Sequence, residues 1–386
     1  NKSKIAEDAL VLAKKNADDA LFQKNVASTK IEQQIARSNA ILAQQEYLNG
    51  NYFRGYEIAK NAYKQNKINA GNSFDKDILA ALYEGYNFLH QKKFIHKNQI
   101  NKIQIGSKPG VFAFSSIDDS LSIVIEDKIL KLKVENLKSF SFCGDYDLII
   151  NQASNRLYKF KLDKASFSEE IVFTDSILSI NKVKYEGLEH FFVINENNFE
   201  LLDASLKSKG KWSNSLKINS LKNYKDQFIS VSGSKIQIID LNLQGNISII
   251  QQYDFDDNIS SVSSLFESSK IALGFDNGNF SIFDLQENKT LILNKTHKTE
   301  ITGCHVITAK NKSVVVTTGM DSQIKILSGY GSDWADKKFT LVDNISNHTS
   351  WINDSKLDYN NTKLLTASAD GSVRFWPLDP ETFLNH

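Results

Sequence analysis

The sequence predicts a mainly β fold made of repeated units, preceded by a small α-helical domain. Near the C-terminus, one strand pattern enters an Asp370-Gly371 turn and a second leaves it, ending at Trp376. Weaker copies of this pattern recur toward the N-terminus. Residues 1–49, by contrast, contain no Gly or Pro and are rich in Ala, Lys, Gln and Glu, a composition that favours helix.

The last copy of the strand pattern is the clearest. Asp370-Gly371 can form a two-residue hairpin loop because Gly tolerates a positive φ, and such a loop lets the two strands pair closely. Val373 and Phe375 recur at the period of two that is typical of a half-buried strand. His348 lies roughly twenty residues before the turn, within the repeat length of a four-stranded unit.

This arrangement resembles a WD40 repeat, the four-stranded blade of a β-propeller. In WD40 blades a buried His, a Ser or Thr, the turn Asp and the strand Trp form a hydrogen-bonded tetrad. Those residues match His348, Ser368, Asp370 and Trp376, so the resemblance implies a structural role for them rather than a catalytic His–Asp pair. Pro377 replaces the usual Asp after the Trp, which makes this repeat a variant.

The resemblance also gives a blade count. One hydrophobic residue marks the third strand of each copy, and the markers are Leu132, Phe160, Leu202, Ile239, Phe283, Leu327 and Trp376. Most intervals are roughly 37 to 49 residues, near the WD40 period. We expect a seven-bladed propeller, with six blades as the alternative because the first interval is only about 28 residues.

The copy before the last is expected to have lost its tetrad. It begins at His297, but Gly319 stands in place of the Ser and Leu327 in place of the Trp.

Ring closure requires a strand from outside the last repeat, because an open ring leaves sheet edges unpaired. The chain ends soon after Trp376, too early for another strand and turn. We therefore expect part of residues 94–105 to pair with the last blade.

The helical domain is expected to span residues 1–92 and the propeller residues 93–386. Helices are predicted at 1–49, 52–65 and 75–89, and the expected apolar stripe of the first contains Ile31, Ile35, Leu42, Ala43, Tyr47 and Leu48. Gly50-Asn51-Tyr52 resembles a tetratricopeptide turn, with an ordinary helical hairpin as the alternative.

The order of parts resembles bacterial signalling proteins in which a STAND-type nucleotide-hydrolysing switch or a caspase-like peptidase leads into a helical linker and WD40 repeats. The resemblance implies that this chain is the sensing or scaffolding end of a larger protein. Because Asn1 is not an initiator Met, we expect further sequence upstream.

Composition narrows the remaining functions. A net charge of +1 and only four arginines argue against nucleic-acid binding. No apolar run reaches the 20 residues of a membrane span. Two cysteines form no disulfide framework, so we expect a cytoplasmic protein, with a periplasmic, tethered one as the alternative. Seven scattered histidines predict no metal site, and no cofactor is expected.

A protein partner is expected to bind on the propeller rim. In WD40 blades the residues just after the His line that rim, which implies Trp351 and Glu300, with Arg374 and Lys325 added from the third strands. Packing of Trp351 against a neighbouring blade is the alternative. Residues 328–347, including Trp334, are longer than a usual blade connection and form a candidate binding insertion.

The sequence therefore predicts a non-enzymatic protein–protein interaction module whose partner and oligomeric state stay open. Two alternatives remain. A propeller hydrolase would use the central channel, although Cys304-His305 is expected to be core rather than a nucleophile pair. An envelope-associated scaffold would carry its membrane anchor upstream of this chain.

Overall fold

A computed structural model describes residues 2–385 apart from several short gaps. The gaps are 154, 214–215, 217, 219, 225–226, 242–246, 265–268, 310–311, 331–337 and 346. Side chains are described from residue 11 onward, apart from those gaps and positions 264, 308–313, 328–343 and 385. The chain divides into two compact units: residues 92–378, and residues 1–91 together with 379–386.

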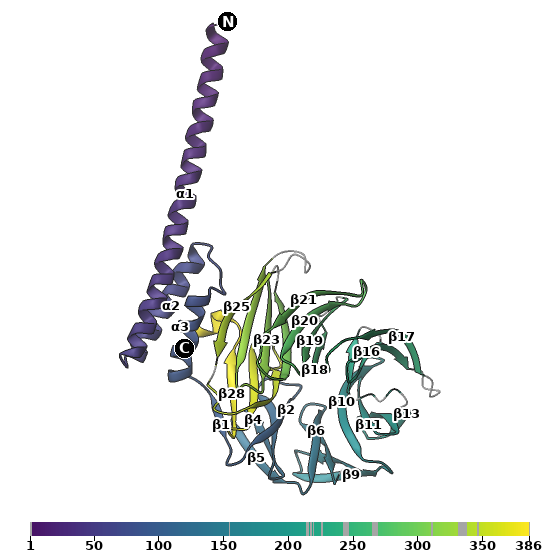
Figure 1. Ribbon diagram of the computed structural model, residues 1–386. Coiled ribbons are helices and arrows are strands. Elements are labelled where there is room, and N and C mark those ends of the chain that lie inside the picture. Colours follow the sequence, from purple (N-terminus) through teal and green to yellow (C-terminus); the bar gives the residue numbers. More distant parts are fainter. Residues whose placement is uncertain are drawn as a thin grey trace. The chain divides into compact units, whose positions relative to one another are not determined.

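The helical unit contains three α-helices in its described part: α1 (Lys2–Leu48), α2 (Tyr52–Ile68) and α3 (Lys76–Leu89). Asp75 begins α3 by accepting hydrogen bonds from the amides of Asp77 and Ile78, as an N-cap residue does. The first part of α1 extends well past α2 and α3 (Figure 1). No helix among the described residues is long and apolar enough to cross a membrane.

The buried face of α1 matches the expected stripe only in part, because Ala43 and Tyr47 are buried as predicted but the large aliphatic residues are not. Ile31, Ile35, Leu42 and Leu48 are all exposed. The buried residues of this helix are Ala36, Ala40, Ala43 and Tyr47. Small side chains at this contact allow α1 to approach α2 closely, so the packing face is made of alanine rather than of large aliphatic residues.

The last residues of the chain belong to the helical unit, which corrects the expected boundary at the C-terminus. A short 3-10 helix, η1 (Pro380–Asn385), packs Phe383 edge-on against Tyr83 and Tyr86. The Tyr56 hydroxyl donates to the Phe383 carbonyl at 3.0 Å. A fully buried Phe383 explains why the chain leaves the propeller at residue 378 instead of ending on it.

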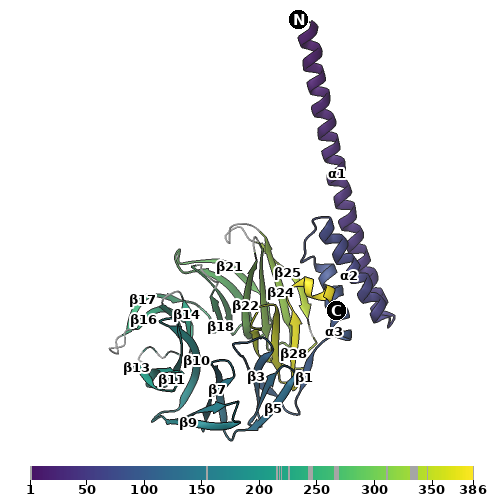
Figure 2. The ribbon, with the colours of Figure 1, turned by 180° about the vertical axis from the view of Figure 1, so that it is seen from behind.

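Within the residues that the structure describes, the strands form seven four-stranded sheets, which confirms the seven-bladed propeller (Figures 1 and 2). The first three blades consist of β2 (Ile100–Ile105), β3 (Val111–Ser116), β4 (Ser120–Ile125), β5 (Lys128–Lys133); β6 (Leu137–Cys143), β7 (Asp147–Gln152), β8 (Arg156–Lys161), β9 (Ser166–Val172); and β10 (Ile177–Tyr185), β11 (Leu188–Asn195), β12 (Asn198–Asp203), β13 (Ser208–Ser213).

The remaining blades follow the same antiparallel order along the chain. They consist of β14 (Ser220–Tyr224), β15 (Gln227–Ser232), β16 (Lys235–Leu241), β17 (Ile247–Asp254); β18 (Ile259–Ser264), β19 (Lys270–Phe275), β20 (Asn279–Asp284), β21 (Lys289–Lys295); β22 (Ile301–Ala309), β23 (Lys312–Gly319), β24 (Ile324–Tyr330), β25 (Lys338–Ile345); and β26 (Ile352–Leu357), β27 (Lys363–Ser368), β28 (Ser372–Pro377) with β1 (Lys93–Ile95).

The ring closes through β1, as the short C-terminus predicted. Phe94 of β1 lies opposite Val373 of β28, so the chain before the first blade supplies the outer strand of the last. Phe94 also packs against Phe112 of the first blade and Phe375 of the last, which joins the two ends of the ring in one apolar cluster.

The first strand marker was wrong. Leu132 lies in β5, the outer strand of the first blade, and the third strand is β4. A marker taken from β4 lengthens the first interval, so the short spacing that had left six blades open disappears.

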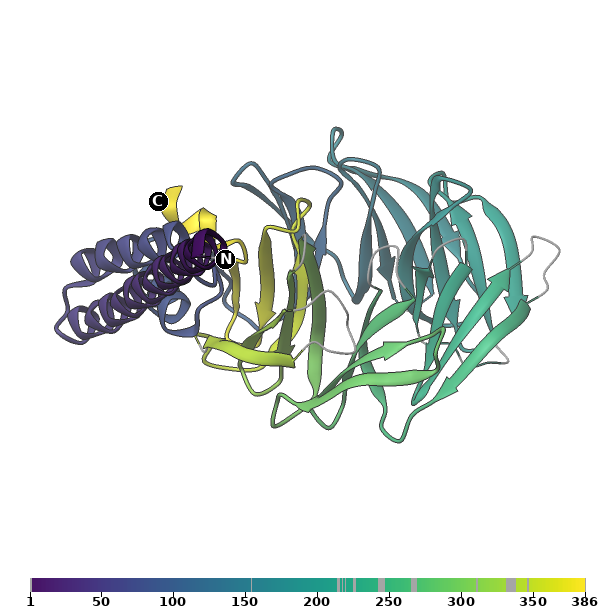
Figure 3. The ribbon, with the colours of Figure 1, turned by 90° about the horizontal axis from the view of Figure 1, so that it is seen from above.

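The propeller core lies between blades rather than within one sheet. Apolar clusters join blades one and two, two and three, three and four, four and five, five and six, and seven and one. The last gap is spanned by contacts of β26 with β22 and β23. Figure 3 shows the strands of successive blades standing beside one another.

Candidate functional site

A hydrogen-bonded relay fixes the entrance to the last blade. His348 Nδ1 lies 2.9 Å from Asp370 Oδ2, and His348 Nε2 lies 2.7 Å from Thr366 Oγ1. The Trp376 indole donates to the same Thr366 hydroxyl at 2.8 Å. Three of the four expected residues therefore meet, but the hydroxyl partner is Thr366 and not Ser368.

Charge in this relay is confined to the carboxylate. Burial lowers the pKa of His348, although Asp370 opposes the shift, so the imidazole is neutral near pH 7. Burial alone would raise the pKa of Asp370, but hydrogen bonds from His348 and Ser372 hold it well below its usual range. Such a pair holds the chain in place and offers no base to a substrate.

The same relay persists in the preceding blade, contrary to expectation. His297 Nδ1 lies 2.8 Å from Asp321 Oδ1 and its Nε2 lies 2.8 Å from Thr317 Oγ1. Gly319 therefore does not remove the hydroxyl of the relay, because Thr317 supplies it at the position that corresponds to Thr366. Only the indole is missing, since Leu327 occupies that position.

His96 lies at the entrance to the first blade, as His297 and His348 do in theirs. The alignment of the repeats in the sequence did not identify it. Its backbone amide donates to the Gly371 carbonyl, just as the His297 amide donates to Gly278. Its Nε2 lies 4.0 Å from Asp118 Oδ2. The signal was present in the sequence, because each of the three histidines stands four positions before the Ile that opens an innermost strand.

The residue just before each of these Ile positions lies at the entrance to an innermost strand. Trp351 is 58% exposed, so most of its side chain is not buried against a neighbouring blade. Glu300 occupies the same position in the neighbouring blade and is half-buried. Burial, and then the Asp276 carboxylate, raise the pKa of Glu300. An exposed indole and a carboxyl group thus lie on adjacent blades.

The two cations taken from the third strands have internal partners. Lys325 donates to the Thr296 carbonyl, and Arg374 Nε donates to Ser372 Oγ at 3.2 Å. Both side chains are half-buried. They lie beside the two relays, in register with Thr317 and Thr366, and are therefore less available to a partner than Trp351.

The expected insertion at residues 328–347 is largely regular blade. Its first residues end β24 and its later ones form β25, the outer strand of the sixth blade. Trp334 lies outside the described residues.

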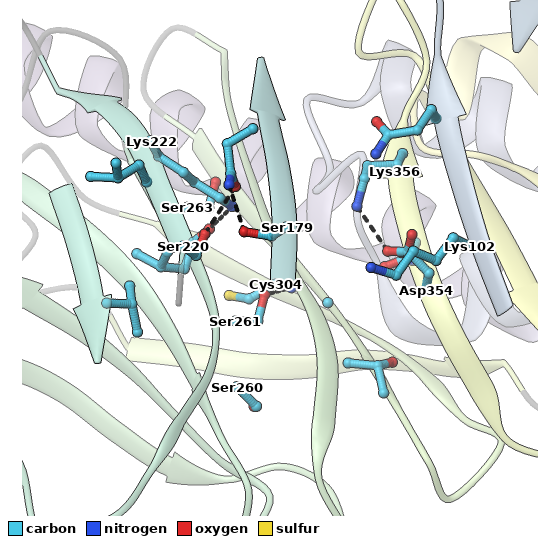
Figure 4. Close-up of a pocket in the computed structure, with 18 of the residues that line it drawn as sticks. Lys102, Ser179, Ser220, Lys222, Ser260, Ser261, Ser263, Cys304, Asp354 and Lys356 are labelled. Carbon is cyan, nitrogen blue, oxygen red and sulfur yellow. Dashed lines mark hydrogen bonds and ion pairs between the residues drawn. The ribbon is translucent and has the colours of Figure 1, made fainter. Parts of the chain in front are cut away.

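Innermost strands of all seven blades line a central channel with a volume of about 960 Å³ (Figure 4). Polar groups dominate its wall. Asp354 from the last blade accepts the Ile103 amide of the first, and Ser261 accepts the Cys304 amide at the equivalent junction between blades five and six. The strand edges at these two junctions are therefore joined by side chains as well as by apolar packing.

The channel brings His305 and Ser355 together, with Nε2 and Oγ 2.9 Å apart. Ser355 is buried and also hydrogen-bonds to Thr318, and Asp354 is the one carboxylate among the residues lining the described channel. Burial raises the pKa of Cys304 to about 12, so its thiol stays protonated. Across the described residues, no group of three His, Cys, Asp or Glu side chains could hold a metal ion.

Comparisons with known proteins agree on the fold. No family model matches the chain. A chain of the mitotic checkpoint complex, known from a crystal structure, superposes with a TM-score of 0.60 at 12% identity, over 74% of this chain and 94% of that one. The fold is that of a WD40-like β-propeller.

One curated relative is similar in sequence. Probable polyketide synthase 29 of Dictyostelium discoideum is 24% identical over 262 residues, which is 67% of this chain. The chain spans 8% of the length of that protein.

Proposed function

We propose that this chain is a non-catalytic protein-binding module whose partner docks on the channel mouth around Trp351 and Glu300. The observation that carries the proposal is the exposed Trp351 side chain. Folding gains little from an indole that is 58% exposed, whereas Trp is enriched among the residues that dominate protein interfaces.

The backbone beneath Trp351 is fixed before any partner arrives. The Ala369 amide donates to the Trp351 carbonyl at 2.8 Å, and the Thr349 amide donates to Asp370 at 3.1 Å. Both ends of this short loop are thus tied to the Asp370-Gly371 turn. A loop already held in one conformation loses less entropy on binding, which favours affinity.

The mouth also favours a partner with basic side chains. Glu300 lies near Asp276, and the raised pKa of Glu300 reflects burial and this like charge. A cation from the partner would relieve the repulsion between the two carboxylates. An acidic pair, with an exposed indole on the next blade, suits a Lys or Arg side chain in particular.

We further propose that the module works within a larger signalling or assembly protein. Helices followed by a propeller support a sensing or scaffolding role, as in the STAND-type and caspase-like proteins that the sequence resembles. A matching segment that makes up only 8% of a curated relative supports the idea that this chain belongs to a longer polypeptide.

The test is affinity capture from lysate of the source cells with the complete chain as bait. Trp351→Ala should reduce capture of the specific partner at least tenfold relative to wild type. Tyr359→Ala is the matched control, because Tyr359 is 54% exposed in the same blade but at the opposite end of β26. That variant should capture the partner normally.

Stability measurements distinguish binding from folding. Trp351→Ala should change the thermal midpoint by no more than about 2 °C, as expected for an exposed residue in a domain of this size. Equal capture by both variants, or a fall in midpoint of more than about 5 °C for Trp351→Ala, would contradict the proposed docking face.

A further inference from the structure

The channel wall is unusually poor in negative charge. Aspartate and glutamate make up 45 of the 386 residues of the chain, but only one of the 31 residues that line the channel, Asp354. Four lysines line it, namely Lys102, Lys182, Lys222 and Lys356. Serine and threonine contribute nine hydroxyl groups and asparagine and glutamine add amide groups, so the channel is rich in hydrogen-bond donors.

Two of the four lysines have no carboxylate partner. Lys182 pairs with Glu189 at 2.5 Å and Lys356 pairs with Asp354 at 2.8 Å. Lys222 donates to the Val262 carbonyl and forms no ion pair with any residue that the structure describes. Lys102 has neither a hydrogen bond nor an ion pair from its side chain in the described part of the chain.

Lys102, Lys222 and Lys356 come from three separate blades and surround the channel. Figure 4 shows Lys102 on β2, Lys222 on β14 and Lys356 on β26 around the channel. The side chains of Lys102 and Lys222 reach solvent within the channel, and the seven blades surround that solvent laterally. Positive charges in such an enclosed space are screened less than charges on an outer surface.

The pKa values of Lys222 and of the nearby His305 reflect this positive electrostatic potential. The pKa of Lys222 is lowered to about 8, chiefly because the surrounding channel wall desolvates the ammonium group and next because of the charge of Lys356, while Cys304 and Asp354 act in the opposite direction. Burial likewise lowers the pKa of His305 to about 3, with Lys356 and Lys222 acting in the same direction. The lining of the channel therefore carries excess positive charge, which an anionic ligand would neutralise.

We propose that the central channel binds a small polyphosphate, with Lys102, Lys222 and Lys356 as its cationic contacts. Several ammonium groups on separate strands fit an anion with several charged oxygens better than a single carboxylate. Lysine is an effective phosphate ligand as a point charge, and hydroxyl and amide donors complete the coordination of phosphate oxygens. The volume of about 960 Å³ lies within the range of small-molecule sites.

Calorimetry with lysine variants of this chain, including one control lysine outside the channel, tests the proposed site. Isothermal titration calorimetry of the complete chain at constant ionic strength would use inorganic triphosphate, ATP and orthophosphate as ligands. Lys222→Gln and Lys102→Gln should each weaken triphosphate binding at least tenfold. Lys211→Gln, an exposed lysine on the outer strand β13, is the matched control and should change the dissociation constant less than twofold.

The two phosphate sources are distinguished by the ligand series. Equal binding of triphosphate and ATP assigns recognition to the phosphate chain, and tighter binding of ATP adds a contact to the nucleoside; both results support the site. Orthophosphate that binds as tightly as triphosphate would overturn the requirement for a polyanion. Binding of triphosphate that Lys211→Gln weakens as much as Lys222→Gln does would show a nonspecific surface effect and overturn the proposal.

Proton uptake gives a second readout that exposed lysines cannot produce. A phosphate beside Lys222 should raise its pKa from about 8, so at pH 8 the wild type should take up more protons on binding than Lys222→Gln does, and at pH 6.5 this difference should vanish. Uptake is measured by titration in buffers of different ionisation enthalpy at both values. Both proteins bind the same ligand, so protons released by the phosphate groups themselves cancel in the comparison. Equal proton exchange by the two proteins at pH 8, or the absence of triphosphate binding at millimolar concentration, would contradict the site.

Discussion

The hydroxyl that His348 contacts comes from Thr366 because two hydroxyl residues lie on the same face of β27. Thr366 and Ser368 are two positions apart, so alternation along the strand places both on that face. Ser368 is at the strand end, where it donates to the Ser350 carbonyl and accepts the Asp370 amide. Sequence spacing cannot tell which hydroxyl is nearer to the imidazole, since only the position of the turn decides it.

We expect Thr366→Val to destabilise the propeller more than Ser368→Ala. Valine keeps the shape of threonine but leaves His348 Nε2 and the Trp376 indole buried without their partner, a loss of about 2 to 4 kcal/mol in the free energy of unfolding. Ser368→Ala removes one turn contact, for a loss of about 1 kcal/mol. Denaturant unfolding followed by tryptophan fluorescence measures both, and equal losses would contradict the assignment of Thr366 to the relay.

Site residues divide in the same way between those that sequence can predict and those it cannot. Trp351 and Glu300 were predicted because each follows a recognisable histidine at a fixed distance. Lys102 and Lys222 were missed because no motif surrounds them. They line the same channel because every innermost strand turns its edge to one axis, and a single sequence shows this only after its blades are correctly aligned.

At the scale of the helices, the sequence predicted the number and ends of the elements, but only part of the buried face of α1. Asp75 begins α3 and Gly50 follows α1, as capping preferences indicate. The buried face of α1, however, is chosen by its partners. Tyr47 lies against Gly55 of α2 and Gly85 of α3, where an added Cβ would come within 2.4 Å of its ring or hydroxyl. Glycine and alanine mark such a contact, and hydrophobic periodicity does not detect them.

We expect Gly85→Ala to destabilise the helical unit although alanine is the better helix former. The propensity gain is about 1 kcal/mol. The new Cβ would lie 2.4 Å from Tyr47 Oη and 2.7 Å from Tyr56 Cδ2, and overpacking of this kind costs about 1 to 3 kcal/mol or more. The two tyrosines are buried and cannot move freely, since the Tyr47 hydroxyl also donates to the Ala81 carbonyl at 2.9 Å, so the steric cost should exceed the gain.

Thermal unfolding followed by helical circular dichroism would measure this effect. Asn61→Ala on the exposed face of α2 is the control and should be neutral or slightly stabilising. Tyr47→Phe in the Gly85→Ala background should recover part of the loss, because it removes the oxygen nearest to the new methyl group. A Gly85→Ala variant as stable as Asn61→Ala would show that α1 does not pack as described.

At the scale of the whole propeller, repetition made the fold predictable. Six apolar clusters between blades follow from similar strands stacked at similar intervals, and the closing strand followed from the need to pair every edge. The error in the first blade has the same origin. Ile129, Leu130 and Leu132 alternate with lysines as a third strand would, but they lie on the outer strand β5 because residues 111–125 already provide the two strands inside it.

Closure by β1 should contribute far more to stability than three residues suggest, because it converts an open stack of blades into a ring. We expect a fragment of residues 92–378 to unfold cooperatively and a fragment of residues 96–378 to lose at least about 3 kcal/mol, the cost of removing a large aromatic side chain from a core. The shorter fragment keeps His96 but loses Phe94 and its contacts with Phe112 and Phe375.

Phe94→Ala in the longer fragment separates the two contributions, since it removes the aromatic contacts and keeps the backbone pairing with β28. Thermal scans and size-exclusion chromatography would compare the three proteins, and the exposed edge of β28 should make the shorter fragment associate. If it instead unfolds at the same temperature as residues 92–378 and stays monomeric, closure through β1 does not hold the ring together.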